Sequence, residues 1–558
     1  MRLPKYIVYY LALKKRIRLG LSPDPALDYH YWQSQGYLYS PPRALSGPLP
    51  LFSAQRLLST FTHKPFVEQN ATFLQRLRLK WRSRHSLTPP LDLPSLPSVG
   101  QQELESLMRG KLYLWQELAR LWRGEDLASA VQRLVLDGKC QLTAAVGQDS
   151  WGRLVCRRCG STRVEPDRWC CKDTTCFQCV ECDALGKAST CTALVAMART
   201  GQDKRRDVAV KLAFSLTAAQ SAASRKLVEF VQNQTSHTCL LWAVCGAGKT
   251  EVSYEAARIV LAKGGRVLFA IPRRSVVREL AERFKGAIRG VPIQALYGGV
   301  SSEQRRREAP LVIATTHQVL RFYRNFDLVI LDEVDAFPYR GSQMLQRGVE
   351  RSLRPGGKRI YMTATPDRAM LERAKGERWD LVRIPVRPHG HPLPVPVPLI
   401  DPSLGEEPGR LPLRLLSIIE SSPRLFLFVP SVRLCKAVAV KLAKTIPKVA
   451  SCHAQAPQRD QKLLAFRNGE IRVLVATSVA ERGITVPGAE VMVLFANSQL
   501  FDEGVLVQMA GRSGRAWDNP TGRVWFVANS QSQAMVEAIG QIKEQNHQAE
   551  QLRLLTVA

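Results

Sequence analysis

Short apolar runs without internal polar residues recur beyond residue 211, separated by stretches with helical spacing. The first group comprises residues 239–244, 267–271, 311–314, 328–331 and 360–362, and the second comprises 425–429, 473–476 and 491–495. A strand that is apolar on both faces must be covered on both faces, as in a parallel sheet flanked by crossover helices. The pattern therefore predicts an α/β fold with two parallel-sheet units in tandem.

The composition of the chain changes at several points, which we interpret as domain boundaries. Residues 1–110 form a basic N-terminal region without a catalytic motif. A helical lead-in and a cysteine-rich module follow over 111–205, with the helical spacing of apolar residues extending over 101–136. The two sheet units are expected over 206–385 and 413–558. Residues 386–412 between them are rich in proline, which predicts an extended linker.

The balance of charge favours a polyanionic partner. The 558 residues include 79 Lys and Arg against 48 Asp and Glu, which gives a formal net charge of +31. Such an excess indicates nucleic acid or an anionic membrane surface, and the alternative is a basic globular protein with no such partner. Because 45% of the residues are hydrophobic, most of the chain is expected to bury a core.

The sequence predicts a cytoplasmic protein. Its apolar runs are shorter than the roughly 18 residues that a membrane span needs, and the patch over residues 6–13 lacks the order of a signal peptide. Thiols stay reduced in the cytosol, so the 13 cysteines are expected to be metal ligands or core residues rather than disulfides.

Residues 243–250, Ala-Val-Cys-Gly-Ala-Gly-Lys-Thr, have the composition of a phosphate-binding loop. They follow an expected strand and lead into an expected helix, which is the setting that such a loop requires. The small residues Gly246, Ala247 and Gly248 allow backbone N–H groups to turn toward phosphate oxygens. Lys249 would then reach the β- and γ-phosphates of ATP, and Thr250 would hold Mg²⁺. The first position is alanine where the general motif has glycine.

Two adjacent carboxylates follow the apolar run 328–331, at the end of a strand where open parallel sheets bind ligands. We expect Asp332 to coordinate Mg²⁺ and Glu333 to deprotonate the water that attacks the γ-phosphate. Alone, such a pair is equally typical of a solvated acidic turn. Its position downstream of a phosphate-binding loop favours the catalytic interpretation.

These two motifs together resemble the superfamily 2 helicases and translocases, and further motifs of that superfamily follow in order over roughly residues 211–535. The resemblance implies two RecA-like domains with ATP and Mg²⁺ bound between them. It implies that Gln220 contacts adenine, that Gly483 belongs to the nucleotide site, and that Thr363 and Thr365 couple the state of ATP to DNA contacts. The positions that match its nucleic-acid-contacting motifs are Arg273, Thr316, His317, Thr477 and Ser478.

The last motif, Gln-Met-Ala-Gly-Arg-Ser-Gly-Arg at 508–515, also has a direct physical interpretation. Arg512 and Arg515 are three residues apart, which places them on one face of a helix. Two guanidinium groups in the ATP cleft would neutralise charge on the transferred phosphoryl group, so both are catalytic candidates. A basic helix face turned to solvent is the alternative.

Cysteines within residues 156–182 have the Cys-x-x-Cys spacing of a tetrahedral Zn²⁺ site. Cys156 and Cys159 form the first pair. Either Cys176 with Cys179 or Cys179 with Cys182 can complete the site, so four of these five cysteines are the expected ligands. The number of cysteines in this region also leaves a second ion open. The others are interpreted as core or incidental residues: Cys140, Cys191, Cys239, Cys245, Cys435 and Cys452.

A four-cysteine module ahead of a superfamily 2 motor, ending in Cys-Asp-Ala-Leu-Gly-Lys at 182–187, resembles the ComFA family of late competence proteins. The loop at 242–251 and Asp-Glu-Val-Asp-Ala-Phe-Pro at 332–338 match that family throughout. The resemblance implies an ATPase at the inner face of the cell membrane that drives uptake of single-stranded DNA during natural transformation. It also implies the channel ComEC, ComFC and DNA-processing proteins as partners, and it is compatible with a homo-oligomer.

Two other functions are compatible with part of this sequence. A primosomal replication-restart helicase of 3'-5' polarity has a similar motor, but its cysteine cluster lies inside the second motor unit, whereas this cluster precedes the first. A zinc-stabilised DNA-binding adaptor with a degenerate motor would lack ATPase residues, all of which are present here.

Overall fold

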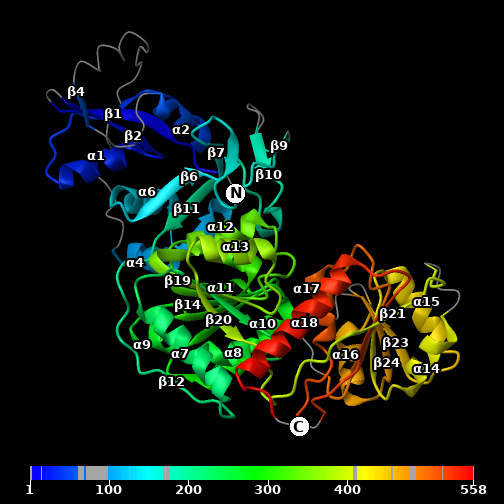
Figure 1. The fold of residues 1–558 in the computed structure, drawn as a ribbon. Helices are drawn as coiled ribbons and strands as arrows, with labels where there is room; N and C mark the ends of the chain where they lie inside the picture. The colour runs from blue at the N-terminus through cyan, green and yellow to red at the C-terminus, as the bar shows by residue number, and fades with distance from the viewer. Residues whose placement is uncertain are drawn as a thin grey trace.

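The structure, a computed structural model, describes residues 3–13, 16–60, 68–70, 98–124, 126–167, 170, 176–405, 411–453, 456–477, 486–517 and 519–556. Figure 1 shows an N-terminal lobe above a cysteine-rich module, followed by two α/β domains side by side. In this described part, no helix is both long enough and apolar enough to traverse a lipid bilayer.

The first α/β domain is built on a parallel sheet in the order β16-β17-β14-β18-β19-β13-β20. Its strands are β13 (Thr238–Ala243), β14 (Val267–Ile271), β16 (Ile293–Leu296), β17 (Leu311–Thr315), β18 (Phe326–Asp332), β19 (Leu353–Thr363) and β20 (Asp380–Ile384). Every residue of β14 and β17 is buried, because helices cover both faces of the sheet. The five apolar runs expected as strands are confirmed.

Helices surround this sheet. They are α7 (Ala218–Gln232), α8 (Lys249–Val252), α9 (Tyr254–Ala262), α10 (Arg274–Ala287), α11 (Ser302–Arg306), η2 (Thr316–Arg321), α12 (Gln343–Ser352) and α13 (Arg368–Gly376). A small antiparallel pair, β12 (Ala209–Val210) with β15 (Ile288–Arg289), closes one side of the domain.

The second α/β domain has a parallel sheet in the order β21-β26-β25-β22-β24-β23. Its strands are β21 (Val397–Ile400), β22 (Leu425–Phe428), β23 (Val449–Cys452), β24 (Val473–Ala476), β25 (Glu490–Leu494) and β26 (Val524–Ala528). Its helices are α14 (Leu413–Ser421), α15 (Val432–Leu442), α16 (Arg459–Asn468), α17 (Glu503–Ala510) and α18 (Gln533–Gln551). Figure 1 shows α18, in red, running from this domain toward the first.

Part of the stretch expected as a linker belongs to the second sheet. Residues 397–400 form β21, which pairs in parallel with β26 at the edge of the sheet. Pro398 is tolerated there because an edge strand can turn a residue without an N–H toward solvent. Residues 397–400 of the stretch expected as an extended linker are therefore extended and also pair with the second sheet.

The N-terminal lobe contains an antiparallel sheet in the order β3-β1-β2-β4. The strands of this sheet are β1 (Ile7–Leu13), β2 (Arg16–Ser22), β3 (Arg43–Ala44) and β4 (Glu68–Asn70). The lobe also contains the helices α1 (Pro25–Ser34) and α2 (Leu51–Ser59). Its buried side chains share one core with α4 (Ser98–Met108), α5 (Trp115–Leu121) and α6 (Leu127–Leu136). The lobe and the helical lead-in are therefore packed as one body.

The cysteine-rich module is built from short antiparallel pairs. One sheet contains β5 (Lys111–Leu114), β11 (Ala193–Met197) and β6 (Cys140–Ala144), with β11 in the centre. A second antiparallel pair consists of β7 (Val146–Gln148) and β8 (Leu154–Cys156), and a third consists of β9 (Val164–Asp167) and β10 (Cys176–Cys179). The short helix η1 (Asp183–Leu185) follows β10. The helical spacing read over 101–136 is interrupted by β5, whose four residues are all buried against β11.

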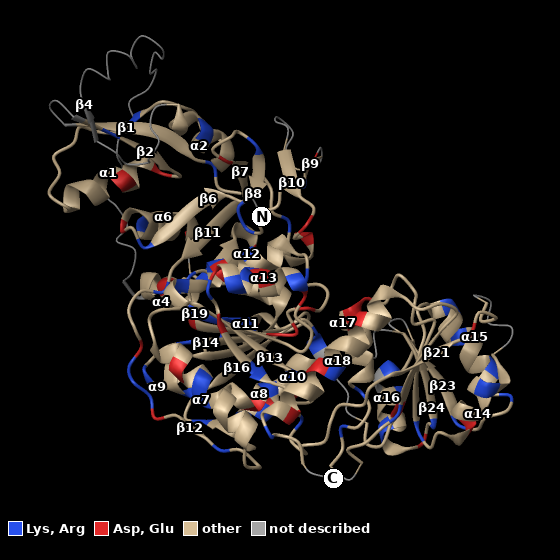
Figure 2. Ribbon diagram, in the orientation of Figure 1, with Lys and Arg blue, Asp and Glu red and all other residues tan. Residues whose placement is uncertain are grey.

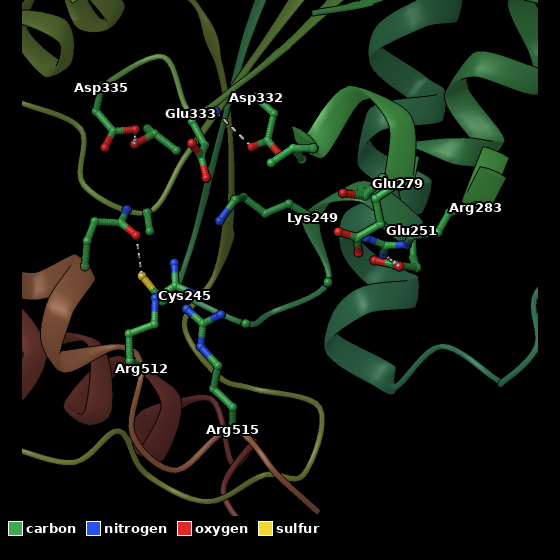
Figure 3. A pocket seen from close by; sticks show the side chains of 17 residues that line it. Cys245, Lys249, Glu251, Glu279, Arg283, Asp332, Glu333, Asp335, Arg512 and Arg515 are labelled. Carbon is green, nitrogen blue, oxygen red and sulfur yellow. Dashed lines mark hydrogen bonds and ion pairs between the residues drawn. The ribbon is translucent and has the colours of Figure 1, made fainter. Parts of the chain in front are cut away.

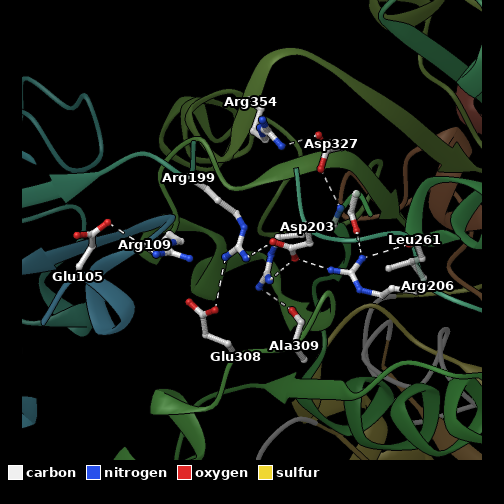
Figure 4. Close-up of polar contacts among 12 residues, drawn as sticks. Glu105, Arg109, Arg199, Asp203, Arg206, Leu261, Glu308, Ala309, Asp327 and Arg354 are labelled. Atoms are coloured by element: carbon white, nitrogen blue, oxygen red, sulfur yellow. Dashed lines mark hydrogen bonds and ion pairs between the residues drawn. The ribbon is translucent and has the colours of Figure 1, made fainter. Parts of the chain in front are cut away.

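An ion-pair network fastens the chain that leaves this module to the first α/β domain (Figure 4). Arg199 contacts Asp203 at 2.6 Å and Glu308 at 3.5 Å. Asp203 also pairs with Arg206, whose guanidinium donates to the carbonyls of Leu261 and Gly265 at 3.1 and 2.9 Å. The module and the first α/β domain are thus held together by buried and half-buried contacts.

Basic residues are distributed over the whole molecule. Figure 2 shows Lys and Arg in the N-terminal lobe, on α13 of the first α/β domain and on α15 of the second. The net charge of +31 is therefore not confined to one segment. A distribution of this kind attracts a polyanion over a broad surface.

The N-terminal lobe buries one carboxyl group completely. Asp28 is 0% exposed and accepts hydrogen bonds from Tyr9 Oη, Ser22 Oγ and Gln132 Nε2 at 2.5, 2.6 and 3.0 Å. Burial raises the pKa of Asp28 from 3.8 to about 7, although the three donors oppose the shift.

We predict that this carboxyl group makes the lobe less stable as the pH rises from about 4 to about 7, because the folded state holds the proton more tightly than the unfolded state. Asp28→Asn removes the ionisation and is expected to flatten this part of the pH dependence of the melting temperature. The exposed Asp137→Asn is the matched control. Identical pH dependence in the Asp28→Asn variant and the unmodified protein would contradict the prediction.

Candidate functional site

The loop after β13 has the backbone geometry of a phosphate cradle. Gly246 and Gly248 have φ angles of 86° and 79°, a region that favours glycine. A Cβ atom on Gly248 would lie 2.5 Å from Gln220 Nε2, so the loop also needs a small residue there. Lys249 and Thr250 begin α8 directly after the loop. This arrangement leaves the backbone N–H groups at a helix N-terminus to bind anions.

Gln220 contacts the phosphate-binding loop through its side chain. Thr217 caps α7, and the side chain of Gln220 completes the capping box. Its Nε2 atom donates a hydrogen bond of 2.9 Å to the carbonyl of Ala247, and the residue is 2% exposed. In this structure Gln220 therefore holds the phosphate loop, and its expected contact with adenine stays a prediction.

The two expected catalytic carboxylates lie opposite the loop. Asp332 ends β18, and the backbone N–H of Glu333 donates to Asp332 Oδ1 at 2.9 Å. Burial raises the pKa of Asp332 to about 6, while the positive charge of Lys249 opposes that shift. A buried carboxylate close to a lysine and to a phosphate cradle suits a Mg²⁺ ion bound together with phosphate oxygens. The residues present therefore fit Mg²⁺ and a nucleotide.

Residues from both α/β domains line one cavity of about 300 Å³ between them. Figure 3 shows Lys249 and Glu333 facing the side chains of Arg512 and Arg515 across this cavity. The full lining consists of Cys245, Gly246, Gly248, Lys249, Thr250, Glu251, Val276, Glu279, Arg283, Asp332, Glu333, Asp335, Thr363, Ala364, Gln508, Arg512 and Arg515. Gly483 lies outside the described residues.

The two arginines of the second domain are held in low-dielectric surroundings. Arg512 is 3% exposed, and Arg515 Nε donates to the carbonyl of Gly511 at 2.6 Å. Burial is the main reason that the pKa values of both guanidinium groups lie below their usual range. Removing cations from water is costly, and an anionic ligand between them would offset that cost.

A chain of hydrogen bonds connects the acidic motif to the second domain. Thr363 Oγ1 and Thr365 Oγ1 donate to the two carboxylate oxygens of Asp335 at 2.6 and 2.8 Å. Gln508 Nε2 then donates to Thr365 Oγ1 at 3.4 Å, and Cys245 Sγ donates to Gln508 Oε1 at 3.2 Å. The two threonines expected to couple ATP state to DNA contacts thus lie on a path between the two domains.

Arg387 is a functional candidate that the sequence did not indicate. It is 2% exposed, and its guanidinium donates to the carbonyl of Cys245 at 3.0 Å in the phosphate loop. It also donates to the carbonyls of Gly511, Ser513 and Gly514 in the arginine-bearing loop of the second domain. One side chain therefore ties the two nucleotide-facing loops together. Its only sequence signal is an arginine within a proline-rich stretch.

The residues expected to contact DNA differ in their exposure. His317 is half-buried at the start of η2, whereas Thr316 beside it is only 2% exposed and offers no accessible oxygen in this conformation. The charge of Arg273 is near enough to Arg512 to contribute to lowering the pKa of that residue. Thr477 follows β24 and is 7% exposed. Ser478 lies outside the described residues, so these roles stay predictions.

Four cysteines form a compact cluster. The Sγ atoms of Cys156, Cys159, Cys179 and Cys182 all lie within 4.8 Å of one another. The Sγ–Sγ distance is 3.7 Å between Cys156 and Cys182, 3.5 Å between Cys159 and Cys179, and 3.7 Å between Cys179 and Cys182. A tetrahedron with Zn–S bonds of about 2.3 Å has edges of roughly 3.8 Å, so the cluster fits Zn²⁺. Of the two ways of completing the site, the structure supports Cys179 with Cys182.

Cys176 belongs to a different group. Its Sγ atom lies with those of Cys170 and Cys191, within 4.8 Å of both. Cys176 and Cys179 stand three residues apart on β10, and side chains three apart in a strand point to opposite faces. Cys191, expected as a core or incidental residue, is buried and belongs to this second group, and the alternative in which Cys176 completes the first site is not the one that the structure supports.

Arginines connect the four-cysteine cluster to the motor. Arg158 is 4% exposed and donates to Cys182 Sγ through Nε at 3.2 Å, which favours the thiolate form. From the first α/β domain, Arg347 on α12 donates to the carbonyl of Gly160 at 2.7 Å. Arg351, one turn further along α12, donates to the carbonyl of Arg158 and, at 2.8 Å, to that of Leu320. The backbone of the first cysteine pair thus rests directly on a motor helix.

Three family profiles match successive parts of the chain. Residues 98–196 match the competence protein ComFA N-terminal domain, residues 213–368 match the res subunit of type III restriction enzymes, and residues 411–517 match the helicase conserved C-terminal domain. These ranges correspond to the cysteine-rich module with its lead-in, the first α/β domain and the second.

Curated relatives match over much longer stretches. The competence protein ComFA of Bacillus subtilis strain 168 is 35% identical over 404 residues, covering 71% of this chain and 86% of that protein. The ComFA of Streptococcus pneumoniae R6 is 34% identical over 406 residues, covering 71% of this chain and 91% of that protein. The replication restart protein PriA of B. subtilis is 25% identical over 199 residues, which cover 33% of this chain and 24% of that protein.

The cysteine cluster predicts a specific loss of metal. Cys159→Ala is expected to lower the zinc content of the purified chain, because three thiolates bind Zn²⁺ less tightly than four. It is also expected to lower the melting temperature, since the module packs on α12. Metal analysis and thermal denaturation test both effects. Full zinc occupancy in the variant would remove Cys159 from the ligand set.

The bridging role of Arg387 predicts a loss of turnover without loss of nucleotide binding. Arg387→Gln should lower the rate of ATP hydrolysis by about 10- to 100-fold, because the arginines of the second domain lose their fixed position. The affinity for a fluorescent ATP analogue should change little, since Lys249 and its loop stay intact. Arg368→Gln, at an exposed position on α13, is the matched control. Unchanged turnover in the Arg387 variant would refute the bridging role.

Proposed function

The chain belongs to the ComFA family of competence proteins, and on that basis we propose that it is an ATP-dependent translocase of single-stranded DNA. In this proposal it drives the uptake of transforming DNA across the cytoplasmic membrane during natural competence. The chain is an ATP-hydrolysing enzyme with a motor of the superfamily 2 helicase class. The observation that carries the proposal is the convergence of charged groups from both RecA-like domains on one cavity.

Five charged residues of the cavity have roles in the proposed hydrolysis. Lys249 neutralises charge on the terminal phosphates, and Arg512 and Arg515 stabilise the charge that spreads over the transferred phosphoryl group. Glu333 accepts a proton from the attacking water. Thr250 and Asp332 would hold Mg²⁺, which would supply further positive charge at the phosphate oxygens.

Movement would follow from the path between the domains. The γ-phosphate lies, in this proposal, between Lys249 and the two arginines, so its release removes the anion that draws the domains together. Thr363 and Thr365 share Asp335 as a hydrogen-bond acceptor, and Thr365 also contacts Gln508. A shift of α17 is therefore passed to the loop that follows β19. Such discrete rearrangements couple nucleotide state to the grip on a track.

The net positive charge of the chain supports single-stranded DNA as the nucleic acid along which the enzyme moves. A net charge of +31 attracts phosphate groups without regard to base sequence, which suits a motor that must process any DNA. The residues proposed to contact the strand are Arg273, Thr316, His317, Thr477 and Ser478. The cysteine module, through Arg347 and Arg351, would hold the DNA or a partner in a fixed position relative to the motor.

Family membership supports the proposed setting. The enzyme would act at the inner face of the cell membrane, beside the channel ComEC, with ComFC and DNA-processing proteins as further partners. The replication-restart alternative receives less support, because the match to PriA covers 24% of that protein and the cysteine cluster here precedes the first motor domain.

The decisive measurement is ATP hydrolysis by the purified protein with no DNA, with single-stranded DNA and with blunt duplex. We expect single strands alone to raise turnover by about tenfold or more, equivalent to about 1.4 kcal/mol. Lys249→Ala should abolish turnover, whereas the exposed Lys263→Ala should retain it. The stimulation should weaken as salt rises, since phosphate contacts release counterions. Equal turnover under all three conditions would contradict a single-strand translocase and favour the adaptor.

A further inference from the structure

A second group of thiols lies at the opposite end of β10 from the four-cysteine cluster. The Sγ atoms of Cys170, Cys176 and Cys191 are all within 4.8 Å of one another. Cys176 starts β10 and Cys179 ends it, so the strand delivers one thiol to each group on opposite faces. The second group is therefore separate from the first, although both belong to the same module.

The backbone fixes two of these three thiols opposite each other. The N–H of Cys179 donates to the carbonyl of Ala188 at 2.9 Å, and the N–H of Thr190 donates to the carbonyl of Phe177 at 2.9 Å. This antiparallel register, continued by one residue, places Cys191 directly across from Cys176. Both are buried, at 8% and 1% exposed. Cys170 approaches from the exposed side.

Polar groups around Cys176 favour a thiolate. Thr190 Oγ1 donates a hydrogen bond of 3.3 Å to Cys176 Sγ, while the same hydroxyl oxygen accepts from the N–H of Phe177 at 3.2 Å. This is the arrangement in which a neighbouring donor orients and stabilises a metal-binding sulfur. Lys187 lies close by, 2.7 Å from Asp167, which stands opposite Cys176 in β9. The positive charge of Lys187 offsets negative charge on the thiolates.

We propose that Cys170, Cys176 and Cys191 bind a second Zn²⁺ ion, whose fourth position is open on the exposed side of the group. Thiolate sulfur favours Zn²⁺ among the common divalent ions, and four-coordinate Zn²⁺ accepts three protein ligands with water as the fourth. The ion would link the segment 186–191, through Cys191, to β10, through Cys176. That segment joins the first cluster to β11, so both ends of β10 would be cross-linked by metal.

A disulfide between Cys176 and Cys191 is the competing chemistry. It would join two cross-strand residues and would leave Cys170 without a role, whereas three converging thiols are what a metal site needs. A disulfide also requires an S–S distance of about 2.05 Å and an oxidising compartment. The two possibilities differ in metal content, in mass and in the number of reactive thiols.

The test is metal analysis of the full-length protein purified under reducing conditions. We expect about two zinc ions per chain, falling to about one in Cys170→Ser and in Cys191→Ser separately. Cys159→Ala, which disrupts the four-cysteine cluster, should spare the second ion, and Cys140→Ala, a buried cysteine outside both groups, should retain both. Cys170→Ser serves as the variant least liable to misfold, because its side chain is exposed.

Cobalt substitution identifies the ligands independently of activity. Co²⁺ bound by thiolates gives sulfur-to-metal charge-transfer absorption. Cys191→Ser should remove the part of this absorption that comes from the second site and should leave the part that comes from the four-cysteine cluster. About one zinc ion per chain in the unmodified protein would overturn the proposal. A mass lower by about 2 Da, with Cys176 and Cys191 protected from alkylation, would overturn it in favour of the disulfide. Neither result would affect the proposed translocase activity.

Discussion

The buried guanidinium of Arg387 is the contact on which the geometry of the ATP cleft depends. A cation removed from water costs several kcal/mol unless its donors are satisfied, and here four backbone carbonyls satisfy them. One acceptor belongs to the phosphate loop, and the others belong to the loop that carries Arg512 and Arg515. The distance between the two loops is therefore set by main-chain atoms.

The sequence predicts the parts of this molecule that depend on local order. Strands buried on both faces are apolar throughout, so those before the phosphate loop and the acidic motif are evident from composition alone. The spacing of small and charged residues in the motifs likewise indicates part of the cavity lining, including Lys249, Asp332 and Arg512. β21 escapes detection because an edge strand needs no two-sided burial, and because the prolines around it are typical of linkers.

Contacts between distant segments cannot be predicted in the same way. Arg387 is an isolated arginine in the sequence, and only the approach of the two domains gives it acceptors. The cysteines show the same limit, since Cys176 with Cys179 and Cys179 with Cys182 have identical spacing. The choice between them follows from the alternation of side chains along β10 and from the position of the segment 186–191, which no local pattern reveals.

One continuous piece of chain joins the cysteine module to the nucleotide site. Arg351 lies near the end of α12, β19 begins directly afterwards, and that strand ends at Thr363 beside the acidic motif. Residues 359–362 of that strand pair in parallel with β13 on one side and β18 on the other, whereas residues 354–357 depart from the ladder and include Gly356 with a φ angle of 76°. The half of β19 next to the nucleotide site is therefore held by both of its neighbours. A displacement of the module against α12 would therefore reach the acidic motif through the chain itself.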